Sequence, residues 1–127
     1  MNVFISGILF GGRPAYVLRL AEDSHFQLLT SSAIRQEVER VLSEKFGWPQ
    51  AIISAACQPF WQASQQVESL VELTDCVDPD DNHILECSLA GQANVIVTGD
   101  HHLLDMKSFR GTAILNVKDF LAQRSEM

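Results

Sequence analysis

The chain has 127 residues, 46% of them hydrophobic and 20% charged, which is typical of one globular domain over residues 1–127 and excludes wholesale disorder. Its net charge of -7 argues against a protein that binds polyanions through bulk electrostatics, because that mode needs clustered Lys and Arg. With no run of about 18 apolar residues, no secretion signal and three cysteines without C-x-x-C spacing, we expect a cytosolic protein with reduced thiols.

The first third of the chain alternates apolar and helical patterns. Residues 3–10 form an apolar run, and the Gly-Gly-Arg-Pro sequence at 11–14 ends it and opens a helix through about Asp23, since proline suits a first helical turn. Residues 26–30 are predicted as a strand. Ser31 or Ser32 can cap the following helix, whose core face is predicted from residues at helical spacing: Ile34, Val38, Val41 and Leu42.

The remaining elements are shorter. Residues 51–70 have a helical pattern that Pro59 is expected to divide into two helices, because an interior proline removes a hydrogen bond. We then predict a short strand at 71–73, a loop over 75–81 that ends in a helix cap, and a helix over 82–91. A β-branched strand at 95–97, a short helix at 101–106, a strand at 113–115 and a helix at 117–123 complete the chain.

This alternation predicts an α/β fold. Strands that alternate with helices form a parallel sheet with helices on both faces, which is a three-layer sandwich around a central parallel sheet. In such a sheet, ligands collect beyond the C-terminal ends of the strands. Functional residues are therefore expected at that edge.

Three acidic residues meet this expectation. Glu37 lies one and a half turns into the helix that follows the strand ending at Thr30, on the flank of its core face. Asp81 begins a helix at the same edge, and Asp100 follows the next strand 19 residues later. One helix down and one strand back returns the chain to its starting edge, so the three carboxylates should converge.

Converging carboxylates in a partly buried site take up protons unless a cation neutralises them. Carboxylate oxygens favour Mg²⁺ or Mn²⁺ over zinc, and such ions activate water and offset charge on a phosphodiester. The pattern therefore indicates metal-dependent phosphodiester hydrolysis. The cation would also explain how so acidic a chain meets RNA.

Several motifs in order along the chain resemble a PIN domain, and most closely the toxin components of toxin–antitoxin pairs. They are residues 2–6 (Asn-Val-Phe-Ile-Ser), Thr30-Ser31 with Glu37, residues 78–85 (Asp-Pro-Asp-Asp-Asn-His-Ile-Leu), and residues 97–100 (Val-Thr-Gly-Asp) with Leu103-Leu104. The resemblance implies a ribonuclease that uses Mg²⁺ or Mn²⁺, usually a homodimer and often bound by an antitoxin protein. It places Glu37, Asp81 and Asp100 on the family's acidic metal-binding and catalytic positions. Asn2 and Thr98 then shape the site.

The resemblance has one departure, at the start of the chain. PIN domains begin with an apolar strand that runs into Asp-Thr-Asn, and Met1 stands where the threonine would be. The first strand and its aspartate would therefore be missing. One interpretation is an internal methionine taken as the start of a longer chain; the other is a true truncation in which a partner or a rearranged N-terminus fills the gap.

Each acidic residue also has a structural interpretation: Asp81 and Asp80 as helix N-terminal acids, Asp100 as a turn residue and Glu37 as a solvated helix flank. His83 and Cys87 share a helix face, but two ligands do not make a zinc site. Two alternative functions stay open. One is a PIN-like binding or regulatory module without catalysis; the other is a receiver-type protein that uses the acidic cluster for Mg²⁺.

Overall fold

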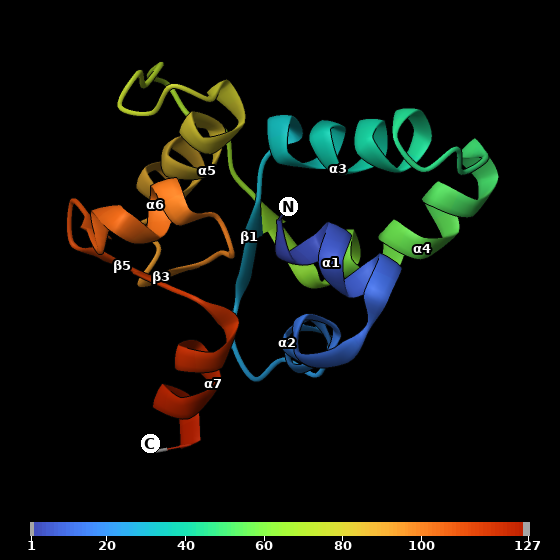
Figure 1. The fold of residues 1–127 in the computed structure, drawn as a ribbon, viewed down its shortest axis with the longest axis horizontal. Helices are drawn as coiled ribbons and strands as arrows, with labels where there is room; N and C mark the ends of the chain where they lie inside the picture. Colours follow the sequence, from blue (N-terminus) through green and yellow to red (C-terminus); the bar gives the residue numbers. More distant parts are fainter. Residues whose placement is uncertain (1, 126–127) are drawn as a thin grey trace.

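A computed structural model describes residues 2–125. Their elements in chain order are α1 (Val3–Phe10), α2 (Gly12–Glu22), β1 (Leu28–Thr30), α3 (Ser32–Glu44), α4 (Gln50–Ala63), β2 (Ser64–Gln66), α5 (Pro79–Ala90), β3 (Val95–Val97), α6 (His101–Met106), β4 (Ser108–Phe109), β5 (Thr112–Leu115) and α7 (Val117–Ser125). Helices surround short strands throughout (Figure 1).

The strands form two separate sheets rather than the single central sheet expected from the sequence. In the first sheet β1 pairs in parallel with β2, with Leu28 opposite Ser64. In the second, β5 lies in the middle, parallel to β3 and antiparallel to β4. Three layers around one sheet are therefore not formed by the described residues.

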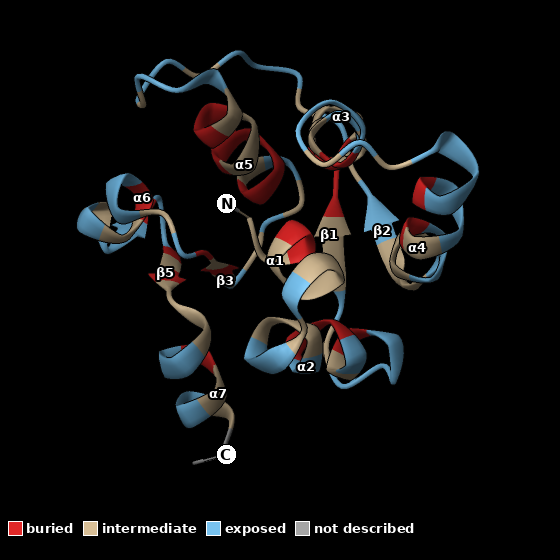
Figure 2. Ribbon diagram, turned by 45° about the vertical axis from the view of Figure 1, so that its right-hand side comes forward, coloured by how far each residue is buried: buried red, intermediate tan, exposed pale blue. Residues whose placement is uncertain are grey.

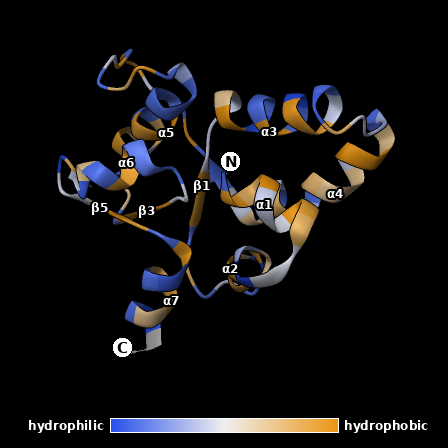
Figure 3. Cartoon of the chain, viewed as in Figure 1, coloured by the Kyte–Doolittle hydropathy of each residue, from blue (hydrophilic) through white to orange (hydrophobic). Residues whose placement is uncertain are grey.

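Two clusters of buried apolar side chains correspond to the two sheets. The first packs α1–α4 around β1 and is listed by its buried members: Phe4, Ile5, Leu18, Ile34, Val38, Leu42, Ile53, Cys57 and Cys87. The second surrounds β3 and β5 and consists of Leu85, Ile96, Leu103, Phe109 and Ile114. Figure 2 shows buried residues on β1, β3 and β5 and on parts of α1, α4 and α5. Figure 3 shows β1, β3 and β5 as largely hydrophobic, with hydrophilic residues on the outward side of α3.

Helix α3 follows the sequence prediction closely. Ser31 is its cap and accepts a hydrogen bond from the Ile34 N–H at 3.3 Å. Ile34, Val38 and Leu42 are buried, so the predicted face is the packed face. This helix carries Glu37 away from the end of β1.

The expected break at Pro59 is wrong, because α4 continues through it from Gln50 to Ala63. The missing hydrogen bond and ring clash of an interior proline cost about 3 kcal/mol. Phe60 and Trp61 beyond it pack on the first core cluster, and the Trp61 ring lies 5.1 Å from that of Phe4. Both rings are partly buried, and this burial offsets part of the cost.

The prediction of a strand at residues 71–73 is also wrong, since backbone groups of this segment form hydrogen bonds with side chains instead of with another strand. The Ser69 hydroxyl accepts from the Val71 N–H and donates to its carbonyl, and the Glu86 carboxylate accepts from the Leu73 N–H at 2.8 Å. Two short strands, β2 and β4, were not predicted. Each has only two or three residues and no run of β-branched side chains.

No single helix among residues 2–125 has both the length and the hydrophobicity to cross a membrane. Helices α1 and α2 have the required length and hydrophobicity only when they are taken together, and the chain bends by 109° between them.

Candidate active site

Asp81 lies in the first turn of α5, with only 5% of its surface exposed. Asp78 caps this helix by accepting a hydrogen bond from the Asp80 N–H at 2.9 Å, and Pro79 occupies its first position. The helix therefore begins three residues before the predicted start, and Asp80 is not its cap. Because Asp78 caps α5, the Asp81 side chain is not needed as its cap.

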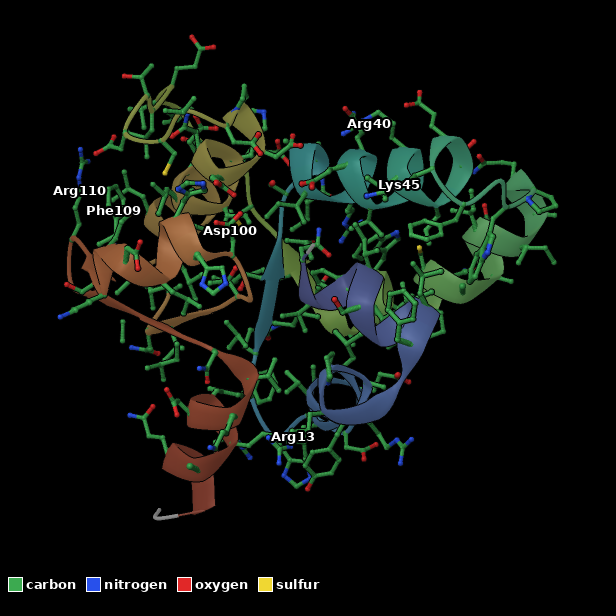
Figure 4. All side chains as sticks on the ribbon, viewed as in Figure 1. Arg13, Arg40, Lys45, Asp100, Phe109 and Arg110 are labelled. Carbon is green, nitrogen blue, oxygen red and sulfur yellow. The ribbon has the colours of Figure 1, made fainter. Side chains whose placement is uncertain are left out.

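Asp100 caps α6 directly after β3. Its carboxylate accepts a hydrogen bond from the His102 N–H at 2.7 Å, and its own N–H donates to the Thr98 hydroxyl at 3.0 Å. Thr98 is buried, and its N–H donates to the Leu115 carbonyl of β5. Thr98 thus ties the turn that carries Asp100 to the sheet. Figure 4 places Asp100 where α6 begins, on the side toward β1.

Asp81 and Asp100 lie together. Burial raises the pKa of Asp81 to about 6, and the negative charges of Asp100 and Asp78 add to the rise, which His102 opposes. Side-chain hydrogen bonding to Asp100 raises this pKa further. Among the described residues neither carboxylate is in a salt bridge. Two carboxyl groups in this position hold a proton near neutral pH or are neutralised by a cation.

Glu37 faces the same acidic cluster from α3. Burial is the largest cause that raises its pKa, to about 7, followed by the charge of Asp80; Asp78 and Asp81 contribute less. The positive charge of Arg40 lowers the pKa of Glu37 and so opposes this rise. The sequence analysis missed Arg40, although a position three residues after Glu37 on a helix is a neighbouring one.

The three predicted residues are thus brought to one region but not into one coordination sphere. Among residues 2–125, no three His, Cys, Asp or Glu side chains are close enough to hold a single metal ion. The donor chemistry of the Asp81–Asp100 pair fits a hard divalent cation, since it offers carboxylate oxygens without a cationic partner. The pKa of Glu37 is raised more by the charge of Asp80 than by that of Asp81.

The comparisons with known proteins bear on this arrangement. A model of the PIN domain matches residues 1–102. The chain belongs to the PIN-domain family. PIN domains are generally metal-dependent nucleases, and the matched range includes Glu37, Asp81 and Asp100. Comparison with curated proteins and with solved structures finds no match.

Asn2 of this PIN domain caps α1. Its side-chain oxygen accepts a hydrogen bond from the Ile5 N–H at 2.9 Å. This contact accounts for an asparagine at the start of the helix without a ligand. Its predicted role in shaping the site stays a prediction.

The sequence analysis overlooked two polar residues of α5 that fix the loop before the site. The Asn82 side chain accepts from the Cys76 N–H at 2.8 Å and donates to the Cys76 carbonyl at 2.9 Å. The buried Glu86 carboxylate contacts His83 Nδ1 at 3.0 Å in addition to Leu73. Asn82 and Glu86 are four residues apart and therefore neighbours on the helix that carries Asp81, and this spacing could have indicated their shared role. His83 is therefore engaged with Glu86, and Cys87 is buried.

Proposed function

We propose that this PIN domain is a metal-dependent ribonuclease in which Asp81 and Asp100 hold Mg²⁺ or Mn²⁺ and Glu37 completes the site. The observation that carries the proposal is the buried Asp81 carboxyl beside Asp100, with a pKa raised to about 6 and no salt bridge among the described residues. A buried carboxyl beside a second carboxylate is unfavourable for stability without a cation, so such an arrangement is commonly kept for function.

The three residues would have different roles. Asp81 and Asp100 lie at the starts of two helices and are suited to orient a cation. When bound, such an ion activates water and offsets charge on the phosphodiester. Glu37, with a pKa of about 7, accepts and releases a proton at neutral pH and is suited to general acid–base work.

RNA would be recognised locally rather than by a broad basic surface. The chain has nine Lys and Arg residues against sixteen Asp and Glu. Among those labelled in Figure 4, Arg13 lies on α2 and Arg110 between β4 and β5, away from Arg40 on α3 and from Lys45 at its end. Dispersed bases make weak phosphate contacts, so affinity would depend on the cation and fall steeply when it is removed.

Mn²⁺ titration and RNA cleavage test this proposal together. The metal displaces protons from carboxyls with raised pKa, so calorimetry at pH 6.5 in two buffers of different ionisation enthalpy should detect proton release. Asp81→Asn and Asp100→Asn should each abolish Mn²⁺ binding and cleavage of a labelled single-stranded RNA. Asp105→Asn, an exposed change on α6, is the matched control and should leave both intact. Unchanged cleavage in the Asp81→Asn, Asp100→Asn double variant would refute the proposal.

The physiological setting is part of the proposal: a toxin component of a toxin–antitoxin pair, cytoplasmic, homodimeric and formed as one domain over residues 1–127. Its support is the sequence resemblance and a set of exposed large apolar side chains that a partner could cover: Phe10, Tyr16, Ile52, Leu70, Val71 and Val77. Light scattering gives the oligomeric state, and growth arrest on induced expression tests the toxin role. A monomer that leaves growth unchanged would contradict both.

A binding module without catalysis is the second candidate. The absence of three metal-ligating side chains within reach of one ion, among residues 2–125, favours it. It predicts that Mn²⁺ at millimolar concentration leaves the melting temperature unchanged. The nuclease proposal predicts a rise that disappears in Asp81→Asn.

A further inference from the structure

A pocket of about 300 Å³ lies between the C-terminal turn of α5 and the hairpin that joins β4 to β5. We call it the hairpin pocket. Gln92 after the end of α5, Asn94 before β3 and Arg110 in the hairpin all line it. Asn94 directly precedes β3, whereas Asp100 comes after the far end of that strand. The hairpin pocket and the candidate active site therefore lie at opposite ends of β3.

Hydrogen bonds hold the walls of the hairpin pocket in place. The Thr112 hydroxyl donates to the Ala93 carbonyl at 2.8 Å, and the Ala113 N–H donates to the Asn94 carbonyl at 3.1 Å. The Ala93 N–H in turn donates to the Ser88 carbonyl at 2.9 Å. The hairpin, the loop before β3 and the end of α5 are thus joined to one another, so the pocket is preformed, as small-molecule sites usually are.

Three polar side chains of the lining remain available to a ligand. Within residues 2–125 Arg110 is in no salt bridge, and the hydrogen bonds of Gln92 and Asn94 are those of their backbone groups. The Arg110 guanidinium lies 5.1 Å from the centre of the Phe109 ring, and both residues are apart from Asp100 (Figure 4). The described lining includes no carboxylate, although the chain has sixteen Asp and Glu against nine Lys and Arg. The pocket therefore offers one positive charge and two amide groups.

Gln92 and Arg110 both have a left-handed backbone, with φ of 52° and 47°. Gln92 lies just past the end of α5, and Arg110 precedes Gly111 in the hairpin turn. Glycine and asparagine are the residues favoured at both kinds of position. Long polar side chains are therefore kept where the backbone disfavours them. Strained residues of this kind cluster at binding sites, and these two line the same pocket.

The C-terminal end of a helix disfavours an anion when its last carbonyl groups are free. In α5 the carbonyls of Cys87, Ser88 and Leu89 accept hydrogen bonds from the N–H groups of residues 91–93. Arg110 is the charged residue of the described lining. The charge that a ligand meets in the hairpin pocket is therefore positive.

We propose that the hairpin pocket binds one nucleotide, free or as a unit of an RNA chain, with Arg110 on its phosphate and the Gln92 and Asn94 amides on its base. A guanidinium can bond to two phosphate oxygens at once. An amide side chain offers a donor and an acceptor, which match those on the edge of a base. The volume is that of a small ligand site and exceeds what a bare phosphate needs. This inference does not rest on the proposed nuclease activity, since none of its three acidic residues lines the pocket.

Amide NMR in metal-free buffer tests the proposal. The probes are the monophosphates of adenosine, guanosine, cytidine and uridine, with inorganic phosphate and citrate for comparison. At least one nucleotide should shift the signals of residues 92–94 and 110–112 with a Kd of about 1 mM or less, and inorganic phosphate should bind about tenfold more weakly. If none of the nucleotides shifts these signals, the proposal is overturned. Phosphate or citrate that binds as tightly as the nucleotides also overturns it, because the pocket would then recognise charge alone.

A matched pair of arginine variants locates the binding. Arg110→Asn removes the cation of the hairpin pocket and should weaken nucleotide binding about tenfold or more, because a charged hydrogen-bond donor is lost. Asparagine tolerates the left-handed backbone, so the melting temperature of this variant should stay equal or rise. Arg13→Asn makes the same change at an exposed residue of α2 and should leave binding unchanged. If the two variants bind equally well, the nucleotide lies elsewhere and the inference fails.

An RNA tetranucleotide without terminal phosphates distinguishes the two sources of the nucleotide. Tighter binding of the tetranucleotide than of the monophosphates assigns the hairpin pocket to a unit of an RNA chain, and weaker binding assigns it to a free nucleotide. In both cases the binding should be lost in Arg110→Asn, and tetranucleotide and monophosphate binding that both persist in that variant contradict the proposal. RNA cleavage is absent from all these measurements, so they fail independently of the nuclease proposal.

Discussion

The part of the molecule built on β1 and β2 and the part built on β3, β4 and β5 are stabilised in different ways. In the first, four helices pack around a two-stranded sheet, and most buried side chains are helical. In the second, strands β3, β4 and β5 supply Ile96, Phe109 and Ile114, three of the five buried members. Helix α5 belongs to both: Cys87 lies in the first cluster and Leu85 in the second, while Ile84 packs against each.

This difference shows how the candidate site depends on α5. Glu37 comes from the first part, Asp100 from the second and Asp81 from α5 itself. The packing of α5 against both parts therefore sets how far Glu37 and Asp100 lie from Asp81. At its C-terminal end that packing is close, because a Cβ added to Gly91 would lie 2.5 Å from Leu29 Cδ1.

The largest effect is expected from a cavity in α5. Leu85→Ala removes a fully buried side chain and should lower the free energy of unfolding by about 2–5 kcal/mol. Since α5 joins the two parts, urea unfolding followed by tryptophan fluorescence and by circular dichroism should still give one coincident transition. Leu70→Ala, at a fully exposed residue, should change stability by less than about 0.5 kcal/mol. Two separate transitions in Leu85→Ala would show that the parts fold independently.

The next effect should be confined to the first part. Arg35 Nε donates to Thr30 Oγ1 at 3.0 Å, Nη2 donates to Ser64 Oγ at 3.0 Å, and the guanidinium lies 5.3 Å from the centre of the Trp61 ring. It thereby ties β1, β2 and α4 together. Arg35→Ala should cost about 2 kcal/mol, as hydrogen bonds of a charged group are lost.

Arg35→Lys should recover less than half of this loss, because an ammonium group cannot reproduce the planar fork. Hydrogen exchange should accelerate in β1 and β2 and stay unchanged in β3 and β5. Equal acceleration in both sheets would mean that Arg35 stabilises the whole chain. The claim that the two parts are stabilised in different ways would then fail.

How far the sequence predicts this molecule depends on the range of the interactions. The face of α3 and the β-branched strand at 95–97 follow from local periodicity, and both are confirmed. Strand β2 has the sequence Ser-Gln-Gln, and its pairing with β1 comes from contacts 36 residues apart that no local pattern carries. Asp81 and Asp100 could be placed together because one helix and one strand separate them. The position of Glu37 depends on how α3 packs on α5, which only the fold determines.

The third effect is a pH dependence that arises where the two parts meet. The pKa of Asp81 is raised from 3.8 to about 6 in the folded state, so the folded chain binds more protons than the unfolded chain between about pH 4 and 6. The free energy of unfolding should therefore fall as the pH rises through this window, and Glu37 extends the fall to about pH 7.

Asp81→Asn removes this contribution. In EDTA it should be about 1–2 kcal/mol more stable than the natural sequence at pH 7 and nearly equal to it at pH 4. Urea unfolding at intervals of one pH unit measures the difference. Asp105→Asn, exposed on α6, should keep the full slope. A natural chain whose stability does not change between pH 4 and 7 would contradict the assigned burial of Asp81.

The smallest effect concerns the base at the rim of the site. Arg40 lies 3.6 Å from both Asp80 and Glu44, with half of its side chain exposed, and exposed pairs contribute little. Arg40→Gln should change stability by less than about 0.5 kcal/mol. Its charge nevertheless lowers the pKa of Glu37, so its removal should raise that pKa in a carboxyl NMR titration. A large loss of stability with an unchanged Glu37 would mean that Arg40 holds α3 to α5 and does not tune the acid.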